Sequence, residues 1–168
     1  KWFLAPSGTG FLYVREAIQD LFKSLYISDQ DASLGAARYE SLGTYDLPTR
    51  AAIGTAQDFL NRIGIQNIQR RLRMLSDHLK AGLHDIPKVR LLSDRASDIS
   101  SPGSTIFDIS GVDLPQWVEL FLDEAKLHVD DHTLDGHCAM RISTHYYVTT
   151  QDIDRFLEKL VELIKRLA

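Results

Sequence analysis

Cysteine is almost absent from this 168-residue chain, and long apolar runs and excess basic charge are absent as well. The single cysteine, Cys138, excludes a disulfide within the chain and favours a reducing compartment, so we expect a cytoplasmic location. No apolar run reaches the roughly 18 residues that cross a bilayer, so we expect no membrane contact. The formal net charge of −4 provides no basic stripe for phosphates, which argues against nucleic-acid binding.

The chain also has no initiator methionine and no recognisable targeting segment. It opens as KWFLAPSGTGFLYVRE, which has the pattern of a loop, a tight turn and a strand. Residues 7–10 predict a turn in which glycine takes a positive φ, and residues 11–14 predict a short buried strand. A lone strand cannot form a sheet, so we expect its partners to lie upstream of Lys1.

Helical periodicity appears first after this opening. Residues 17–25 predict a short helix, and residues 28–45 predict a long loop. A longer helix is expected from Pro48 to Ile63, because proline is acceptable in a first turn. Asp46 is its candidate cap, and Gly64 should end it.

The remaining two thirds of the chain alternates helices and strands. Residues 65–86 carry apolar side chains every three or four positions, which predicts an amphipathic helix that Pro87 stops. Two further helices are expected over 114–126, with Asp113 as candidate cap, and after a capping box at 149–152. Short strands are expected at 89–92, 104–110, 127–129 and 139–145. The order α, β, β, α, β, β, α predicts an α/β or α+β domain with helices on one face of a sheet.

Several stretches resemble one known family. Lys1-Trp2, followed by Ala5-Pro6-Ser7-Gly8-Thr9-Gly10 and Phe11-Leu12-Tyr13-Val14, is similar to the cofactor-lysine segment of the class V aminotransferases. These are pyridoxal-phosphate enzymes of fold type I, and they include cysteine desulfurases and isopenicillin N epimerase-like enzymes. The stretch from Arg38 to Asp46, with Gly43-Thr44, resembles the family's Gly-Thr loop. Met140-Arg141-Ile142-Ser143 resembles its C-terminal strand, although Val148 stands where the family often has asparagine.

The resemblance implies a role for Lys1. A lysine amine can form an imine with the aldehyde of pyridoxal 5'-phosphate, and it can later move the proton at the substrate Cα. By composition alone, Lys1 is an ordinary solvated lysine. In the family context it is the expected catalytic and cofactor-binding residue.

The resemblance also assigns Gly43 and Thr44 to the cofactor phosphate. Glycine lets a backbone approach closely, and a hydroxyl with an amide suits a phosphate oxygen. In the family this loop serves the neighbouring subunit's site, which implies a homodimer with a shared active site. From the residues alone, a simple turn before the next helix is the favoured interpretation.

Arg141 is the candidate substrate residue. Strand alternation sends Arg141 and Ser143 to one face and Met140 and Ile142 to the other. From the residues alone this arginine could simply lie on a solvated face. The resemblance implies that it binds the α-carboxylate of an amino-acid substrate through its planar fork.

The histidines do not predict a metal site. His128, His132, His137, Cys138 and His145 have no spacing typical of zinc ligands, so we expect no metal. Cys138 could be a desulfurase nucleophile, but it stands only three residues before Arg141, at the strand entrance, where that family's cysteine does not lie. A small buried cysteine is the commoner case.

Two kinds of function follow from these observations. The first is a pyridoxal-phosphate enzyme acting on an amino acid, as a transaminase, epimerase or C–S lyase. In that case the chain is the C-terminal half, with residues 1–63 as the tail of a large cofactor domain and 64–168 as the small domain. This half alone should be inactive. The alternative is a non-catalytic domain or fragment that serves in packing or dimerisation.

Overall fold

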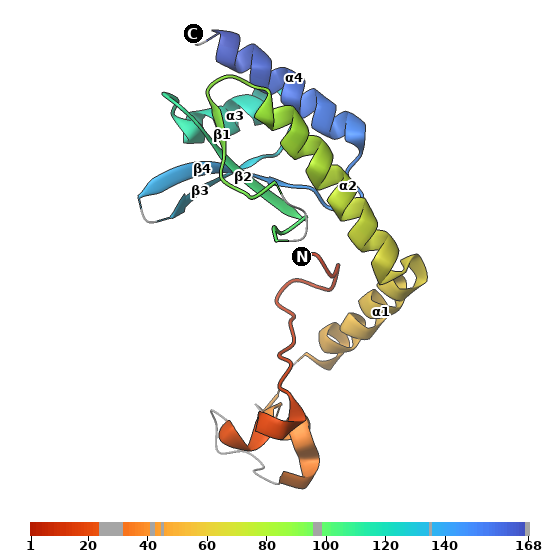
Figure 1. The fold of residues 1–168 in the computed structure, drawn as a ribbon. Helices are drawn as coiled ribbons and strands as arrows, with labels where there is room; N and C mark the ends of the chain where they lie inside the picture. Colours follow the sequence, from red (N-terminus) through yellow and green to blue (C-terminus); the bar gives the residue numbers. More distant parts are fainter. Residues whose placement is uncertain (24–31, 41–42, 45, 96–98, 135, 167–168) are drawn as a thin grey trace. The chain divides into compact units, whose positions relative to one another are not determined.

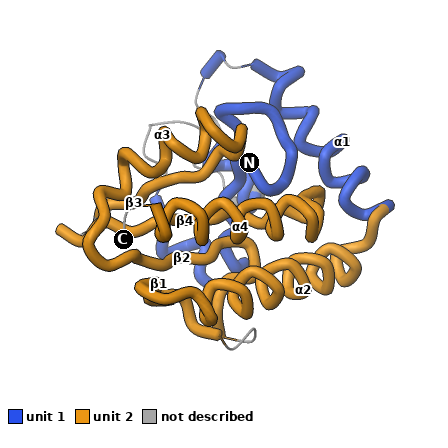
Figure 2. Tube along the Cα trace, turned by 90° about the horizontal axis from the view of Figure 1, so that it is seen from above, with its two compact units in different colours: residues 1–62 blue, residues 63–168 orange. Residues whose placement is uncertain are grey.

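The computed structural model describes all residues except 24–31, 41–42, 45, 96–98, 135 and 167–168. The chain divides into two compact units, Lys1–Arg62 and Ile63–Ala168, coloured separately in Figure 2. That the first unit is the tail of a larger domain stays a prediction.

The first unit contains two 3₁₀ helices, η1 (Glu16–Leu21) and η2 (Ala32–Tyr39), and the helix α1 (Leu47–Ile63). The Oδ1 atom of Asp46 accepts a hydrogen bond from the backbone N–H of Thr49 at 3.1 Å, so the predicted cap is confirmed. Gly64 follows α1 with a φ of 88°, in the left-handed region that glycine tolerates. Of the helix expected over 17–25, the described part is wrong in kind, because η1 is a 3₁₀ helix of six residues and Phe22 is extended. Residues 24–25 lie outside the described residues.

Residues 11–14 form no strand, which corrects the expectation from their apolar run. Phe11, Leu12 and Tyr13 are 74%, 84% and 80% exposed. A strand is stabilised by hydrogen bonds to a neighbour, and none of the described residues pairs with this segment. The apolar pattern therefore predicted a burial that the described residues do not supply.

The second unit follows the predicted order of elements. These are α2 (Ile65–His84), β1 (Val89–Leu91), β2 (Ser104–Ile109), α3 (Leu114–Ala125), β3 (Asp130–Leu134), β4 (His137–Ser143) and α4 (Thr150–Arg166). The sheet is antiparallel throughout with the strand order β1-β2-β4-β3, and α2 and α4 lie side by side (Figure 1). The predicted α+β architecture is thus confirmed for this unit.

The core lies between the helices and one face of the sheet. Phe107 on β2 and Met140 on β4 are opposite each other in the register and fully buried. The ring of Phe107 meets that of Phe156 on α4 edge-on, with centroids 6.2 Å apart. Leu79 of α2 and Phe121 of α3 complete the centre of the same cluster. Burial of these side chains holds the three helices on that face.

Some boundaries differ from the predictions for identifiable reasons. The strand expected at 127–129 lies at β3 instead, because β3 and β4 pair as a hairpin around Gly136, which has a φ of 78°. Helix α2 ends at His84, three residues before the proline expected to stop it. Asp113 occupies the N-cap position of α3, but its side chain makes no capping bond.

The capping box before α4 is confirmed. The hydroxyl of Thr149 accepts a hydrogen bond from the N–H of Asp152 at 3.1 Å. In return, the Oδ2 atom of Asp152 accepts from the N–H of Thr149 at 2.9 Å. Two otherwise unpaired donors at the start of α4 are satisfied in this way.

Candidate active site

Lys1 lies in the first unit, in the segment that precedes η1, and it is exposed. Its carbonyl accepts a hydrogen bond from the N–H of Leu4 at 3.1 Å, which curls the segment into a turn. Lys1 lines a small hollow of about 60 Å³, whose other lining residues include Phe3, Thr9, Phe11 and Ile53. The amine thus lies on an accessible surface of this unit, as covalent attachment to a cofactor requires.

The Gly-Thr-Gly stretch forms the predicted turn. Gly8 has a φ of 80°, and both the N–H and the hydroxyl of Thr9 donate to the carbonyl of Pro6, at 3.2 and 2.6 Å. Because these bonds close the turn locally, the direction of the chain after Gly10 depends little on neighbouring elements.

Gly43 and Thr44 lie before α1 in the same unit, and both are exposed. Gly43 has a φ of 90°, which a residue with a side chain adopts only with strain. A Cβ atom added there would meet nothing within 4 Å, so the backbone conformation, rather than crowding, requires the glycine. An open amide followed by an exposed hydroxyl fits the chemistry of a phosphate ligand. Residues 41–42 and 45, on either side, are outside the described residues.

Arg141 lies in the second unit, on β4, and points to the face of the sheet opposite the core. Its neighbours Met140 and Ile142 pack on the core side, as the alternation predicted. In the register, Arg141 is flanked by Ile106 on β2 and by Asp130 on β3. Arg141 is therefore the middle residue of a row of three that crosses β2, β4 and β3.

The guanidinium of Arg141 makes one ion pair. Its Nη2 atom donates to the Oδ2 atom of Asp130, and the two side chains are 33% and 48% exposed. Its Nε atom is buried and has no hydrogen-bond partner among the described residues. A buried donor without a partner is costly, so the Nε–H group of Arg141 is a candidate donor to a carboxylate oxygen.

A second cross-strand pair on the same face is more complete. The Nε atom of Arg90 donates to both oxygens of Asp108, at 3.2 and 3.0 Å, and Nη2 donates to Oδ2 at 2.5 Å. Arg90 on β1 and Asp108 on β2 are directly opposite in the register. Both Nε and Nη2 of Arg90 are therefore paired with a carboxylate, whereas Nη2 of Arg141 is paired and its Nε is not.

Two contacts fix the segment that follows β4. The Nη2 atom of Arg71, on α2, donates to the carbonyl of Val148 at 2.8 Å. The rings of His145 and Tyr147 stack with centroids 4.2 Å apart. Burial of the Tyr146 hydroxyl raises its pKa, so this side chain remains neutral.

Cys138 does not lie beside Arg141. It stands on β4, three positions earlier, and its side chain packs against the core on the opposite face of the sheet. Cys138 is only partly buried there, so the small buried cysteine expected from the sequence is confirmed in its packing but not in full burial. Among the described residues, no three His, Cys, Asp or Glu side chains gather as metal ligands, and none of the described helices is long and apolar enough to span a membrane.

The predicted site residues are thus divided between the units. Lys1, Gly43 and Thr44 belong to the first, and Arg141 belongs to the second. No hydrogen bond links Lys1 with Thr44 within the described part of the chain. Sequence reasoning missed Asp130, because its opposition to Arg141 follows from the register of the hairpin rather than from any local pattern.

The model of the family aminotransferase class-V matches residues 1–156. A probable cysteine desulfurase from Methanothermobacter thermautotrophicus is 28% identical over 97% of this chain and 45% of its own length. The isopenicillin N epimerase of Amycolatopsis lactamdurans is 28% identical over 98% of the chain and 45% of its own length. The chain therefore spans less than half the length of these curated relatives.

Solved structures show the same fold. The apo cysteine desulfurase from Thermococcus onnurineus superposes with a TM-score of 0.81 at 24% identity, over 97% of this chain and 44% of that one. The cystine C-S lyase C-DES, in complex with its reaction product cysteine persulfide, superposes with a TM-score of 0.77 at 21% identity, over 96% and 44%. With a family model that covers nearly all of its residues, the chain belongs to the class-V aminotransferases, a family of pyridoxal-phosphate enzymes.

Proposed function

We propose that this chain forms the C-terminal part of a pyridoxal-phosphate enzyme that acts on an amino acid. The proposal rests chiefly on Arg141, whose buried Nε atom has no hydrogen-bond partner among the described residues. A substrate α-carboxylate would satisfy it. The family match over residues 1–156 supports the same assignment.

Each predicted site residue has a role in this proposal. Lys1 attaches the cofactor through its amine and moves the proton at the substrate Cα. Gly43 and Thr44 bind the phosphate through an amide and a hydroxyl. Arg141 binds the substrate carboxylate and so orients the Cα atom. When bound, the cofactor supplies an electron sink for the carbanion at that atom.

The position of Cys138 bears on the type of reaction. A thiol that accepts sulfur from a substrate must reach the substrate, but Cys138 is the only cysteine of the chain and packs on the core face, away from Arg141. We therefore propose that this chain supplies no nucleophilic thiol. Among the activities of the family, this favours an epimerase, a transaminase or a C–S lyase whose reaction needs no cysteine from this part of the protein.

We further propose that the enzyme is a homodimer in which Gly43 and Thr44 serve the partner's cofactor. The exposed apolar side chains of Phe11, Leu12 and Tyr13 support a packing surface for other parts of the protein. The same surface favours the second candidate, a non-catalytic domain that serves in packing or dimerisation. The cytoplasmic location stays a prediction.

Cofactor attachment separates the two candidates. The full-length protein, mixed with pyridoxal phosphate, should develop an absorbance band at the violet edge of the visible range. Reduction with borohydride, followed by peptide mapping, should find the cofactor on Lys1. The Lys1→Ala variant should lose the band, whereas Lys23→Ala, a change of another exposed lysine, should keep it. A full-length protein that never develops the band would leave the non-catalytic candidate standing.

A further inference from the structure

We propose that Asp130 is a positioning residue and an internal competitor at Arg141, which a substrate carboxylate must displace. This inference rests on the proposed role of Arg141 as the carboxylate site. It adds that the chain itself carries the group that occupies this site when substrate is absent.

The geometry of the hairpin places the two side chains within reach of each other. Asp130 is the first residue of β3, and its Cα atom is directly opposite that of Arg141 in the antiparallel ladder. Side chains at such positions share one face and lie within reach of each other. On the other flank Arg141 meets Ile106, which offers no charge. Asp130 is therefore the carboxylate that the sheet itself presents to this arginine.

The contact is incomplete, which makes it exchangeable. Only the Nη2 atom of Arg141 donates to Asp130, and the Nε atom has no partner among the described residues. The Arg90–Asp108 pair on the same face uses both Nε and Nη2. A free carboxylate that engages two nitrogens of Arg141 gains a hydrogen bond that Asp130 does not make.

Exposure keeps the cost of exchange low. About half of the Asp130 side chain is open to solvent. When its ion pair is broken, the carboxylate can be hydrated without leaving its strand, and ion pairs this exposed are weak. Before exchange, Asp130 holds the guanidinium in one orientation and partly neutralises it. Its removal should therefore strengthen the binding of carboxylates by roughly two- to fivefold.

Acetate is the probe, since it carries the carboxylate and nothing else. The Nε–Hε resonance of Arg141 is followed by NMR in the labelled full-length protein during titration with sodium acetate. Sodium chloride is reduced in step, because ionic strength screens such contacts. In the Asp130→Asn variant, the shift should reach half-saturation at roughly two- to fivefold less acetate than in the wild type.

Three matched variants separate this effect from a structural one. Asp130→Glu retains the carboxylate and should behave as the wild type. Asp108→Asn breaks the other cross-strand pair on the same face, and Asp131→Asn makes the same charge change one residue further along β3. Both should leave the Arg141 titration unchanged. If Asp130→Asn loses the dispersed spectrum of a folded chain, Asp130→Ser takes its place.

The outcomes distinguish this inference from the function on which it rests. If acetate shifts the Arg141 resonance with equal or weaker affinity in Asp130→Asn, the internal competitor is disproved and the carboxylate site stands. If acetate shifts the resonance in none of the proteins, the carboxylate site is disproved, and the competitor with it.

Discussion

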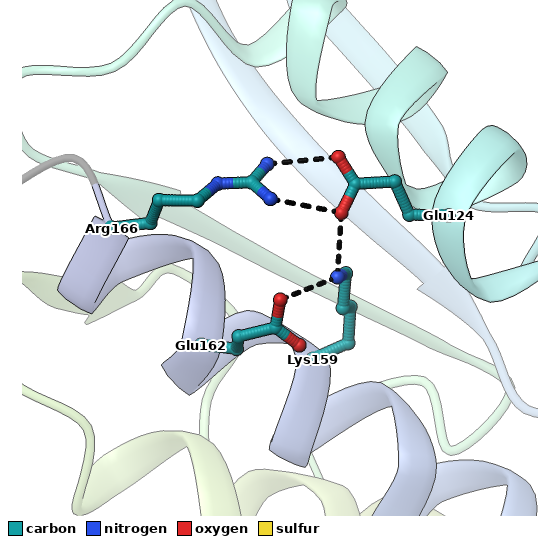
Figure 3. A network of polar contacts seen from close by, with 4 residues as sticks. All are labelled: Glu124, Lys159, Glu162 and Arg166. Carbon is teal, nitrogen blue, oxygen red and sulfur yellow. Dashed lines mark hydrogen bonds and ion pairs between the residues drawn. The ribbon is translucent and has the colours of Figure 1, made fainter.

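The guanidinium of Arg166 donates to both carboxylate oxygens of Glu124, at 3.0 and 2.9 Å, and ties the last turn of α4 to the last turn of α3. The ammonium of Lys159 also donates to Glu124, at 2.7 Å, and to Glu162, at 2.8 Å (Figure 3). Two cations therefore converge on one carboxylate, which lowers the pKa of Glu124 to about 2, chiefly through the hydrogen bonds from Arg166 and then Lys159.

This pKa predicts an acid-dependent loss of stability. The ordinary pKa of the carboxyl is 4.5 and the folded-state pKa is about 2, so the contribution of Glu124 is complete above 4.5 and disappears as the pH falls towards 2. In urea unfolding, Glu124→Gln should be less stable than the wild type near neutral pH, and the difference should shrink through this window. Glu119→Gln, an exposed change on the same helix, should show no such trend. A constant difference at all pH values would contradict the prediction.

The capping box makes a prediction about α4. Thr149→Ala removes the hydroxyl that accepts from the N–H of Asp152, so it should lower the free energy of unfolding by about 1 kcal/mol. Chemical denaturation measures this change. Thr150→Ala, one residue into the helix, is the control and should change the free energy by less than about 0.5 kcal/mol. Equal effects of the two variants would mean that the box does not stabilise the helix.

Gly82 makes a prediction about the contact between α2 and α4. A Cβ atom at this position would clash with the Cδ1 atom of Leu157. The Leu157 side chain must shift to make room, so Gly82→Ala should stabilise the wild type by clearly less than the about 1 kcal/mol that the helix propensity of alanine alone would give. In the Leu157→Ala background the clash is gone, and the same substitution should stabilise by about 1 kcal/mol.

The control for this cycle is Gly54, in α1, where an added Cβ atom would meet nothing within 4 Å. Gly54→Ala should stabilise α1 by about 1 kcal/mol in either background. Thermal unfolding followed by circular dichroism checks all five variants. Additive effects of Gly82→Ala and Leu157→Ala would show that the two positions are not coupled.

Arg141 makes a prediction about catalysis. Arg141→Lys keeps the positive charge but loses the planar fork. Under the proposed function, the full-length protein should therefore lose roughly ten- to hundredfold in kcat/KM for an amino-acid substrate. Most of the loss should appear in KM, because the carboxylate is bound both before and during the reaction. Arg90→Lys, on the same face but with its fork already filled, should change neither constant by more than about twofold. Unchanged KM in Arg141→Lys would remove this residue from the substrate site.

Sequence reasoning succeeded where the signal is local. The amphipathic spacing of α2 depends only on residues within that helix, and so does the cap at Thr149. The alternation that sends Arg141 away from Met140 also needs no partner, because it follows from the extended backbone. The family could be predicted in the same way, because the segments at Lys1, Gly43 and Arg141 are short motifs that stand in the order expected for the family. The family model matches residues 1–156.

The predictions that failed concern segments whose structure depends on residues far away in the sequence. Residues 11–14 have the composition of a buried strand, yet no described residue pairs with them, and Phe11, Leu12 and Tyr13 lie exposed. The third strand was expected three residues too early, because the turn at Gly136 sets the register of the hairpin and the apolar residues before it do not.

By itself, the sequence determined the family, the order of the elements and the arginine that points away from the core. Only the tertiary structure decided that Asp130 faces this arginine and that one edge of the guanidinium has no partner among the described residues. The physical reason is that faces follow from backbone periodicity, which is local, whereas neighbours across a sheet follow from register, which is a property of two strands together.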